Sequence, residues 1–138
     1  MDKYKEITLV AGAIHNPDEP RHYMTITDSP QLWRAKIENY TLAESSAALE
    51  LKEVGSHIYS PVIYFPFDNV KMEYLRKNKK STFCPLKGST YYLDFVVDKL
   101  SISDVAWVYK NAIPDSARIK NMVAFNAAKV DLMNLNLA

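Results

Sequence analysis

The sequence has few of the residues that build crosslinks, metal cages or phosphate loops. Its 138 residues include a single cysteine, which excludes an intramolecular disulfide, a cysteine-rich zinc site and a reductase cycle with a resolving cysteine. Only three residues are glycine, and no glycine-rich loop that would bind phosphate occurs. We therefore expect a fold that is stable without a disulfide, metal or cofactor.

Strong net charge and long hydrophobic runs are missing as well. The formal net charge is +1, so no overall field attracts nucleic acid or an acidic membrane. No segment approaches the ~20 apolar residues that cross a bilayer, and the apolar run near the N-terminus is too short for a signal peptide. We expect a cytoplasmic protein that binds neither nucleic acid nor membranes. The basic run at residues 76–80 is either a solvated turn or an anion-binding patch.

What the chain does contain is a series of short segments rich in tyrosine, phenylalanine and valine, each bounded by turn residues. Such segments favour a pleated sheet, and their spacing of about ten residues is typical of antiparallel folds. We predict a single all-β domain over residues 1–138, with an N-terminal arm (1–22) and a frayed tail (133–138). The predicted strands cover residues 22–27, 33–38, 49–54, 62–65, 82–84, 90–97, 105–109, 123–125 and 130–132, the last two as a final pair. A hairpin turn at residues 39–40 is expected to lead from 33–38 into 41–45, and residues 7–14 form either a short strand or an extended arm.

Few helical signals interrupt this pattern. Asp68 is placed to cap a short helix over residues 69–76, in which Val70 and Tyr74 would lie one turn apart. A single helical turn is expected to begin at Pro114. Gly88 is expected to adopt a backbone conformation that other residues avoid.

Several motifs follow one another in a recognisable order. They are Glu44-Ser45, Glu53-Val54, Tyr-Phe-Pro-x-x-x-Val (64–70), Thr-x-Cys-Pro-x-Lys-Gly (82–88), Tyr91-Tyr92, Ala-Trp-x-Tyr (106–109) and Val-Ala-Phe (123–125). This series resembles the bacterial domain-of-unknown-function family 427. The likeness runs over roughly residues 11–132, and the Thr-x-Cys-Pro-x-Lys-Gly motif is its most specific part.

The resemblance implies a β-tent, in which two antiparallel sheets lean together. Methionine sulfoxide reductase B, Mss4-like proteins and the drug-binding domain of cereblon share this architecture, and many relatives hold zinc with two cysteine pairs, which this chain lacks. The family is also labelled a nucleotidyltransferase domain. Metal-dependent nucleotidyl transfer needs paired carboxylates. Gly88-Ser89 fits the usual start of that motif, but no Asp-x-Asp occurs anywhere in the chain.

Cys84 and Lys87 are the residues on which covalent chemistry would depend. Cys84 is a small buried apolar residue, part of a pocket wall, or a catalytic thiol whose pKa Lys87 lowers. No histidine lies close to it in the sequence. Lys87 with Gly88 forms either a tight turn with a solvated lysine or a contact to an anion.

Aromatic residues and one carboxylate complete the candidate site. Tyr64, Tyr91, Trp107 and Tyr109 either pack in the core or wall a pocket, and Tyr91 and Tyr92 must face opposite ways because they are adjacent in a strand. Glu53, if buried, needs a cation, for which Lys87 and Arg34 are the candidates.

The leading functional hypothesis is a small-molecule-binding module with a pocket between the two sheets. Tyr64, Tyr91, Trp107 and Tyr109 would form its walls, and Glu53, Cys84, Lys87 and Gly88 its polar contacts. One alternative is an enzyme, either a nucleotide-handling transferase or an activity that depends on Cys84. Another is an interaction domain whose residues 7–22 pair with a second copy in a homodimer.

Overall fold

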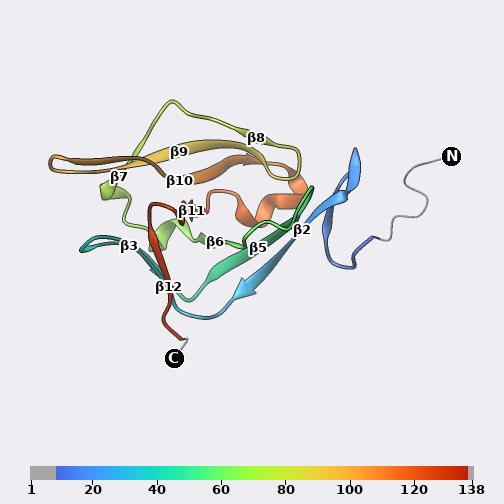
Figure 1. Cartoon of the computed structure of the whole chain (residues 1–138), viewed down its shortest axis with the longest axis horizontal. Helices are drawn as coiled ribbons and strands as arrows, with labels where there is room; N and C mark the ends of the chain where they lie inside the picture. The colour runs from blue at the N-terminus through green and yellow to red at the C-terminus, as the bar shows by residue number, and fades with distance from the viewer. Residues whose placement is uncertain (1–8, 137–138) are drawn as a thin grey trace.

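The computed structural model describes residues 9–136, which form strands and short 3₁₀ turns (Figure 1). The strands are β1 (Ile14–Asn16), β2 (Glu19–Ser29), β3 (Trp33–Ile37), β4 (Tyr40–Ser45), β5 (Ala48–Val54), β6 (Val62–Phe65), β7 (Leu75–Lys77), β8 (Phe83–Cys84), β9 (Gly88–Val97), β10 (Leu100–Ala112), β11 (Val123–Phe125) and β12 (Asp131–Asn134). The 3₁₀ turns are η1 (Phe67–Asn69), η2 (Met72–Tyr74) and η3 (Pro114–Ile119).

These strands form two antiparallel sheets, which confirms the predicted all-β, two-sheet architecture. The large sheet has nine strands in the order β1-β2-β5-β6-β11-β10-β9-β7, with β8 also paired to β9. The small sheet has three strands in the order β12-β3-β4. In Figure 1 the long β9–β10 hairpin crosses the top of the molecule, while β2 and β5 slant away beneath it.

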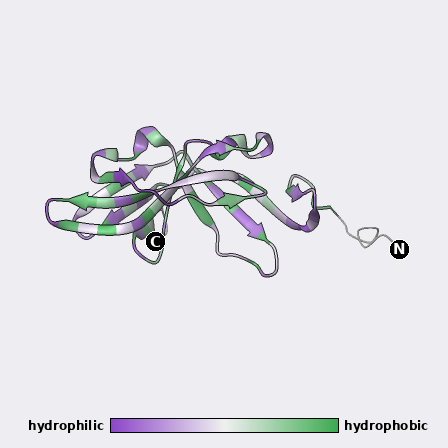
Figure 2. Ribbon diagram, turned by 90° about the horizontal axis from the view of Figure 1, so that it is seen from above, coloured by the Kyte–Doolittle hydropathy of each residue, from purple (hydrophilic) through white to green (hydrophobic). Residues whose placement is uncertain are grey.

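The main hydrophobic core fills the space between the two sheets. Because side chains alternate along a strand, Ile63 and Phe65 of β6 enter this core while Tyr64 between them faces the other way. Figure 2 shows the corresponding alternation of hydrophobic and hydrophilic residues along the long hairpin. From the small sheet, Ala35 and Leu42 are fully buried in the same core.

A second core lies on the opposite face of the large sheet. Tyr64 and Tyr109 belong to it, together with Leu86 from the turn before β9 and Ile119 from η3, and Leu86 is only 1% exposed. The two cores explain why β6 and β11 are apolar throughout: they are covered on both faces.

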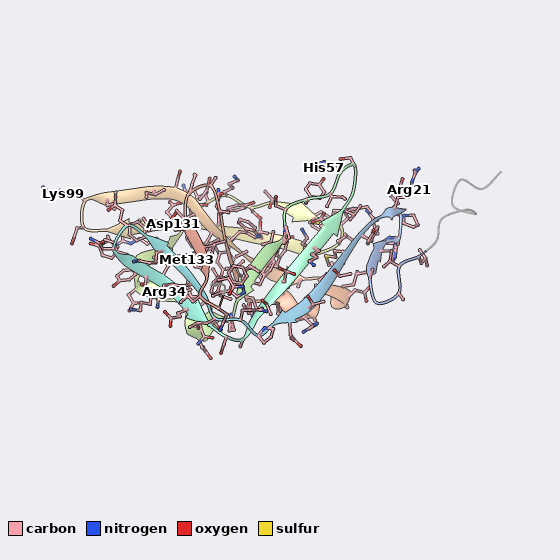
Figure 3. All side chains as sticks on the ribbon, turned by 60° about the horizontal axis from the view of Figure 1, so that its bottom comes forward. Arg21, Arg34, His57, Lys99, Asp131 and Met133 are labelled. Carbon is pink, nitrogen blue, oxygen red and sulfur yellow. The ribbon has the colours of Figure 1, made fainter. Side chains whose placement is uncertain are left out.

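The two ends of the molecule carry different loops. Figure 3 shows Lys99 at the tip of the β9–β10 hairpin, and Arg21 and His57 at the far end near β2 and β5. Arg34, Asp131 and Met133 lie in the small sheet, where Met133 is paired with Arg34. Within residues 9–136, no helix is long and apolar enough to cross a membrane.

The predicted helix over residues 69–76 is wrong. This segment holds η1, η2 and the start of β7, and neither 3₁₀ turn has a side-chain cap, so Asp68 does not act as one. Val70 is extended, forms an isolated bridge with Ala43, and is followed by a hydrogen bond from the Lys71 amide to the Leu42 carbonyl at 2.7 Å. Pairing with the small sheet therefore overrides the helical spacing of the sequence.

Parts of the predicted arm and tail form strands in the structure. Residues 1–8 of the arm lie outside the described residues, whereas Ile14 and His15 form part of β1 and pair with Met24 and Tyr23 of the same chain. At the other end, β12 extends to Asn134, into the tail that was expected to fray. The segments 123–125 and 130–132, expected as a pair, belong to different sheets.

Candidate functional site

An aromatic cavity of about 380 Å³ opens on the second-core face of the large sheet. Its walls carry four aromatic rings from three strands: Tyr64 of β6, Tyr92 of β9, and Trp107 and Tyr109 of β10. Val62, Lys80, Lys87, Asp104 and Asn126 complete the lining. None of these residues belongs to the small sheet, so the cavity lies outside the space between the two sheets where the sequence analysis placed it.

Strand register explains why the rings gather. Trp107 is paired with Tyr92 across β10 and β9, and their ring centroids are 6.3 Å apart. Tyr109 lies two residues beyond Trp107 on the same face, with its ring centroid 6.5 Å from that of Tyr64. The site therefore rests on paired strands of a sheet rather than on a flexible loop.

Beside the rings, three charged or polar side chains form a continuous chain through Glu53. Lys87 Nζ donates to Glu53 Oε1 at 2.7 Å, and His22 Nε2 donates to Glu53 Oε2 at 2.7 Å. The side chains are 12%, 15% and 20% exposed for Lys87, Glu53 and His22. Asn16 Nδ2 lies 3.3 Å from His22 Nδ1, which fits a histidine that carries its proton on Nε2.

This arrangement fixes the charge of Glu53. Its burial acts to raise the pKa, but the hydrogen bonds from Lys87 and His22 and the charge of Lys87 outweigh burial and hold the pKa below its usual value. Of the two cations expected as partners of Glu53, Lys87 is the one that forms the ion pair. Arg34, the other candidate partner, instead pairs with Glu44 at 2.7 Å.

The turn before β9 places Lys87 against Glu53. The Lys87 amide donates to the Cys84 carbonyl at 3.1 Å, and the Ile113 amide donates to the Lys87 carbonyl at 3.0 Å. The Ser116 hydroxyl donates to the carbonyl of buried Leu86. The backbone on both sides of Lys87 is thus tied to the end of β10 and to η3.

Gly88 is needed because the chains approach closely here. Its φ is +114°, and a Cβ at this position would lie 2.1 Å from the Asn111 carbonyl oxygen. Both observations confirm the unusual conformation predicted for Gly88. Gly88 shapes the site through the backbone, since it has no side chain to offer a ligand.

Tyr91 and Cys84, like Glu53 and Gly88, are sequence-predicted site residues that do not line the cavity. Tyr91 points to the opposite face of β9, where its ring packs against the main core under the Lys77 ammonium. Its neighbour Tyr92 takes the position in the cavity. Cys84 is half-buried against the second core and does not line the cavity, although its thiol is close enough to Tyr64 and Tyr109 to act on their ionisation.

Sequence reasoning missed His22, Tyr92, Lys80, Asp104 and Asn126. His22 is 31 residues from Glu53, and only the pairing of β2 with β5 brings them together. Whether Tyr91 or Tyr92 enters the cavity depends on which face of β9 is turned toward the main core. The alternation of side chains shows that the two tyrosines face opposite ways, but not which of them faces the cavity. Asp104 has a positive φ and lies in the bulge between Ile102 and Ala106, which determines the faces to which the following residues of β10 point.

Two hydroxyls of the cavity, those of Tyr64 and Tyr109, have raised pKa values and remain protonated well above neutral pH. Burial raises the pKa of Tyr64, while a hydrogen-bonding interaction with the Trp107 side chain acts in the opposite direction. Burial also raises the pKa of Tyr109, and the nearby Tyr64 adds to the effect. Both groups therefore offer a neutral O–H to a ligand.

The rim of the cavity is a polar network. Asn78 Nδ2 donates to Asp94 Oδ1 and to Asp104 Oδ1, each at 2.7 Å, and the Asp104 amide donates to Asp94 Oδ1 at 2.9 Å. Lys80 Nζ lies 3.6 Å from Asp104 and 4.5 Å from the centroid of the Tyr92 ring. Within residues 9–136, no group of three or more His, Cys, Asp or Glu side chains could hold a metal ion.

Fold and site define a small all-β domain of two antiparallel sheets with an aromatic cavity on the outer face of the larger one. A family model described as a domain of unknown function (DUF427), with the short name NTP_transf_9, matches residues 25–136. The chain belongs to this family, as the resemblance indicated. A comparison with curated proteins gave no match.

Proposed function

We propose that this protein is a small-molecule-binding module and that its ligand occupies the aromatic cavity. The observation that carries the proposal is the convergence of Tyr64, Tyr92, Trp107 and Tyr109 beside a lysine held in place by Glu53. Aromatic walls combined with polar groups that the fold holds in place are features of sites for small ligands. The volume of about 380 Å³ lies within the range of such sites.

The lining suggests the chemistry of the ligand. The faces of Trp107 and Tyr92 would stack on a planar ring. Lys87 and Lys80 supply ammonium groups, and the protonated hydroxyls of Tyr64 and Tyr109 supply neutral donors. Donors outnumber carboxylates, since Asp104 is the one acid among the described residues of the lining. We infer a planar metabolite that carries a carboxylate, phosphate or carbonyl acceptor.

Tryptophan fluorescence gives a direct test because the chain has two tryptophans and only one of them lines the cavity. Ligands would first be selected by thermal shift from metabolites and from nucleotides with and without magnesium. A ligand at 100 times its Kd adds about 2.7 kcal/mol to stability, which raises the Tm of such a domain by several degrees. In Trp33→Phe, a true ligand changes the emission of Trp107 in a saturable way.

The matched control is Trp107→Phe, which keeps Trp33 in the small sheet and should show no saturable change. Trp107→Ala should weaken the same ligand at least ten-fold. The proposal fails if selected ligands leave Trp107 emission unchanged and bind Trp107→Ala with the original affinity. It also fails if no compound of the inferred class shifts the Tm. Turnover of a bound nucleotide would instead favour the transferase alternative.

A further inference from the structure

A separate surface, on the other face of the β9–β10 hairpin, combines an apolar hollow with a cluster of lysines. The apolar hollow has a volume of about 400 Å³ and the lysine hollow about 390 Å³. They share Lys77, Tyr91 and Lys110, so they lie side by side and are together called the groove. The apolar part adds Phe67, Met72, Leu75, Leu93 and Asn121, and the polar part adds Asn78, Lys79, Lys80, Ser81, Ser89, Thr90 and Asn111.

The lysines converge from segments that are distant in the sequence. Lys77 ends β7, Lys79 follows it in the loop, and Lys110 comes from β10. Among the residues that the structure describes, Lys80 pairs with Asp104, whereas Lys77, Lys79 and Lys110 form no ion pair. Of the described residues that line the two hollows, none is a carboxylate. The groove is therefore locally cationic in a chain whose net charge is only +1.

The apolar hollow is suited to a hydrocarbon chain. Its floor is formed by the buried side chains of Leu75 and Leu93, and Phe67 stands at its edge with 44% of its surface exposed. Among its described lining residues, Asn121 is the only polar one besides the shared Lys77, Tyr91 and Lys110. A nucleobase needs several hydrogen-bonding partners at its edge, which this lining does not provide, whereas an acyl chain needs none.

We propose that this groove binds a single-chain anionic amphiphile, a fatty-acid carboxylate. Its acyl chain lies against Phe67, Met72 and Leu75, and its carboxylate lies between Lys77 and Lys110. Charge complementarity selects the anionic headgroup, because no carboxylate among the described residues neutralises these ammonium groups. The proposed contacts to the chain and the carboxylate do not use the aromatic cavity, since Tyr91 and Tyr92 point to opposite faces of β9 and the one described residue that lines both the cavity and the lysine hollow is Lys80.

The test compares decanoate with decanol and acetate, using amide chemical shifts of the full chain at concentrations below micelle formation. Decanoate should cause saturable shifts around Phe67, Leu75, Tyr91 and Lys110. Decanol should bind at least ten-fold more weakly because it lacks the charge, and acetate should bind too weakly to saturate because it lacks the chain.

Variants separate the groove from general surface charge. Lys77→Gln with Lys110→Gln should weaken decanoate at least ten-fold, and Phe67→Ser should weaken it as well. The matched control, Lys52→Gln with Lys99→Gln, removes the same charge from exposed positions elsewhere and should bind as the unmodified chain does. All the replaced side chains are exposed, and dispersed amide spectra would verify that each variant is folded.

Four results would overturn the inference. If decanol bound as tightly as decanoate, the groove would be an apolar patch that does not select charge. If acetate bound as tightly as decanoate, the lysines would bind anions without a site for the acyl chain. Equal loss in both double variants would mean that only overall charge matters. A nucleoside triphosphate that binds the same lysines more tightly than decanoate would assign the groove to polyphosphates.

Discussion

Replacing Glu53 by glutamine should destabilise the protein strongly, because it leaves a buried lysine without its counter-charge. Lys87 and Glu53 side chains are 12% and 15% exposed. Removing one partner of a buried pair costs about 3–5 kcal/mol when the remaining charge stays uncompensated. Since the introduced amide would still accept one hydrogen bond, we expect about 2–3 kcal/mol for Glu53→Gln.

This loss converts into a readily measured change in Tm. An unfolding entropy of about 2.1 cal/mol/K per residue gives roughly 3–4 °C per kcal/mol for a domain of this length, so the Tm should fall by about 7–10 °C. The matched control is Glu44→Gln. Its ion pair with Arg34 has the same 2.7 Å length, but the side chains are 34% and 42% exposed. An exposed pair contributes at most about 1 kcal/mol, so the control should lose only a few degrees.

The same pair should shape stability in acid. The pKa of Glu53 is lowered on folding from 4.5, so its contribution is fully present above pH 4.5 and is lost as the pH falls through the folded value. Unmodified protein should therefore lose stability more steeply below pH 4.5 than Glu53→Gln does. The difference in free energy of unfolding between the two should shrink from pH 7 toward pH 3.

Calorimetry or urea unfolding across this pH range would check both parts. Equal Tm losses in Glu53→Gln and Glu44→Gln would refute the argument from burial. A constant difference between Glu53→Gln and the unmodified protein from pH 7 to pH 3 would refute the argument from charge. Adding Lys87→Met to Glu53→Gln should recover part of the lost stability, because the unpaired ammonium is then removed.

Three further results are expected. In urea unfolding, Gly88→Ala should lower the free energy of unfolding by more than about 3 kcal/mol and Gly12→Ala by about 1–2 kcal/mol. Both glycines have positive φ, but only at Gly88 would the added Cβ meet a backbone carbonyl, so equal losses would contradict this reasoning. The free energy of unfolding should fall as the pH rises above about 10, because folded Tyr64 and Tyr109 keep protons that the unfolded chain releases. Tyr64→Phe should make this dependence on pH shallower. An unchanged dependence would count against the burial of the Tyr64 hydroxyl. Asn78→Ala should cost about 1–3 kcal/mol, measured by Tm, since its amide joins two aspartates, and a neutral result would mean that water replaces it.

The class of fold and the need of Glu53 for a cation were predictable because each follows from a local rule. Short aromatic and β-branched segments between turn residues indicate strands in any context. A carboxylate in an apolar neighbourhood needs a cation, and Lys87 was available. The requirement for Gly88 was visible for a similar reason, since the motif places glycine where a turn enters a strand.

The rest depended on tertiary information that one sequence does not contain. The spacing of Val70 and Tyr74 fits a helix, but the bridge from Val70 to Ala43 decides the conformation. The tyrosine that enters the cavity is set by the covering of β9, and the register of β10 is shifted by a bulge between Ile102 and Ala106. The face that a strand turns to the core and its register with its neighbours depend on the whole sheet. The sequence therefore indicated that an aromatic cavity exists but not where it lies.

The Thr-x-Cys-Pro-x-Lys-Gly motif can be understood as a device that positions Lys87. The Thr82 amide donates to the Thr90 hydroxyl at 2.9 Å, the Cys84 carbonyl closes the turn, and Gly88 permits the close approach of β10. Cys84 contributes to this geometry through its backbone, which a serine would supply equally well. Because the lysine is fixed by backbone bonds and by Glu53, its placement beside the cavity is independent of the thiol. The ligand binding proposed for the cavity and any chemistry of Cys84 are therefore separable, and Cys84→Ser should remove the second while leaving the first intact.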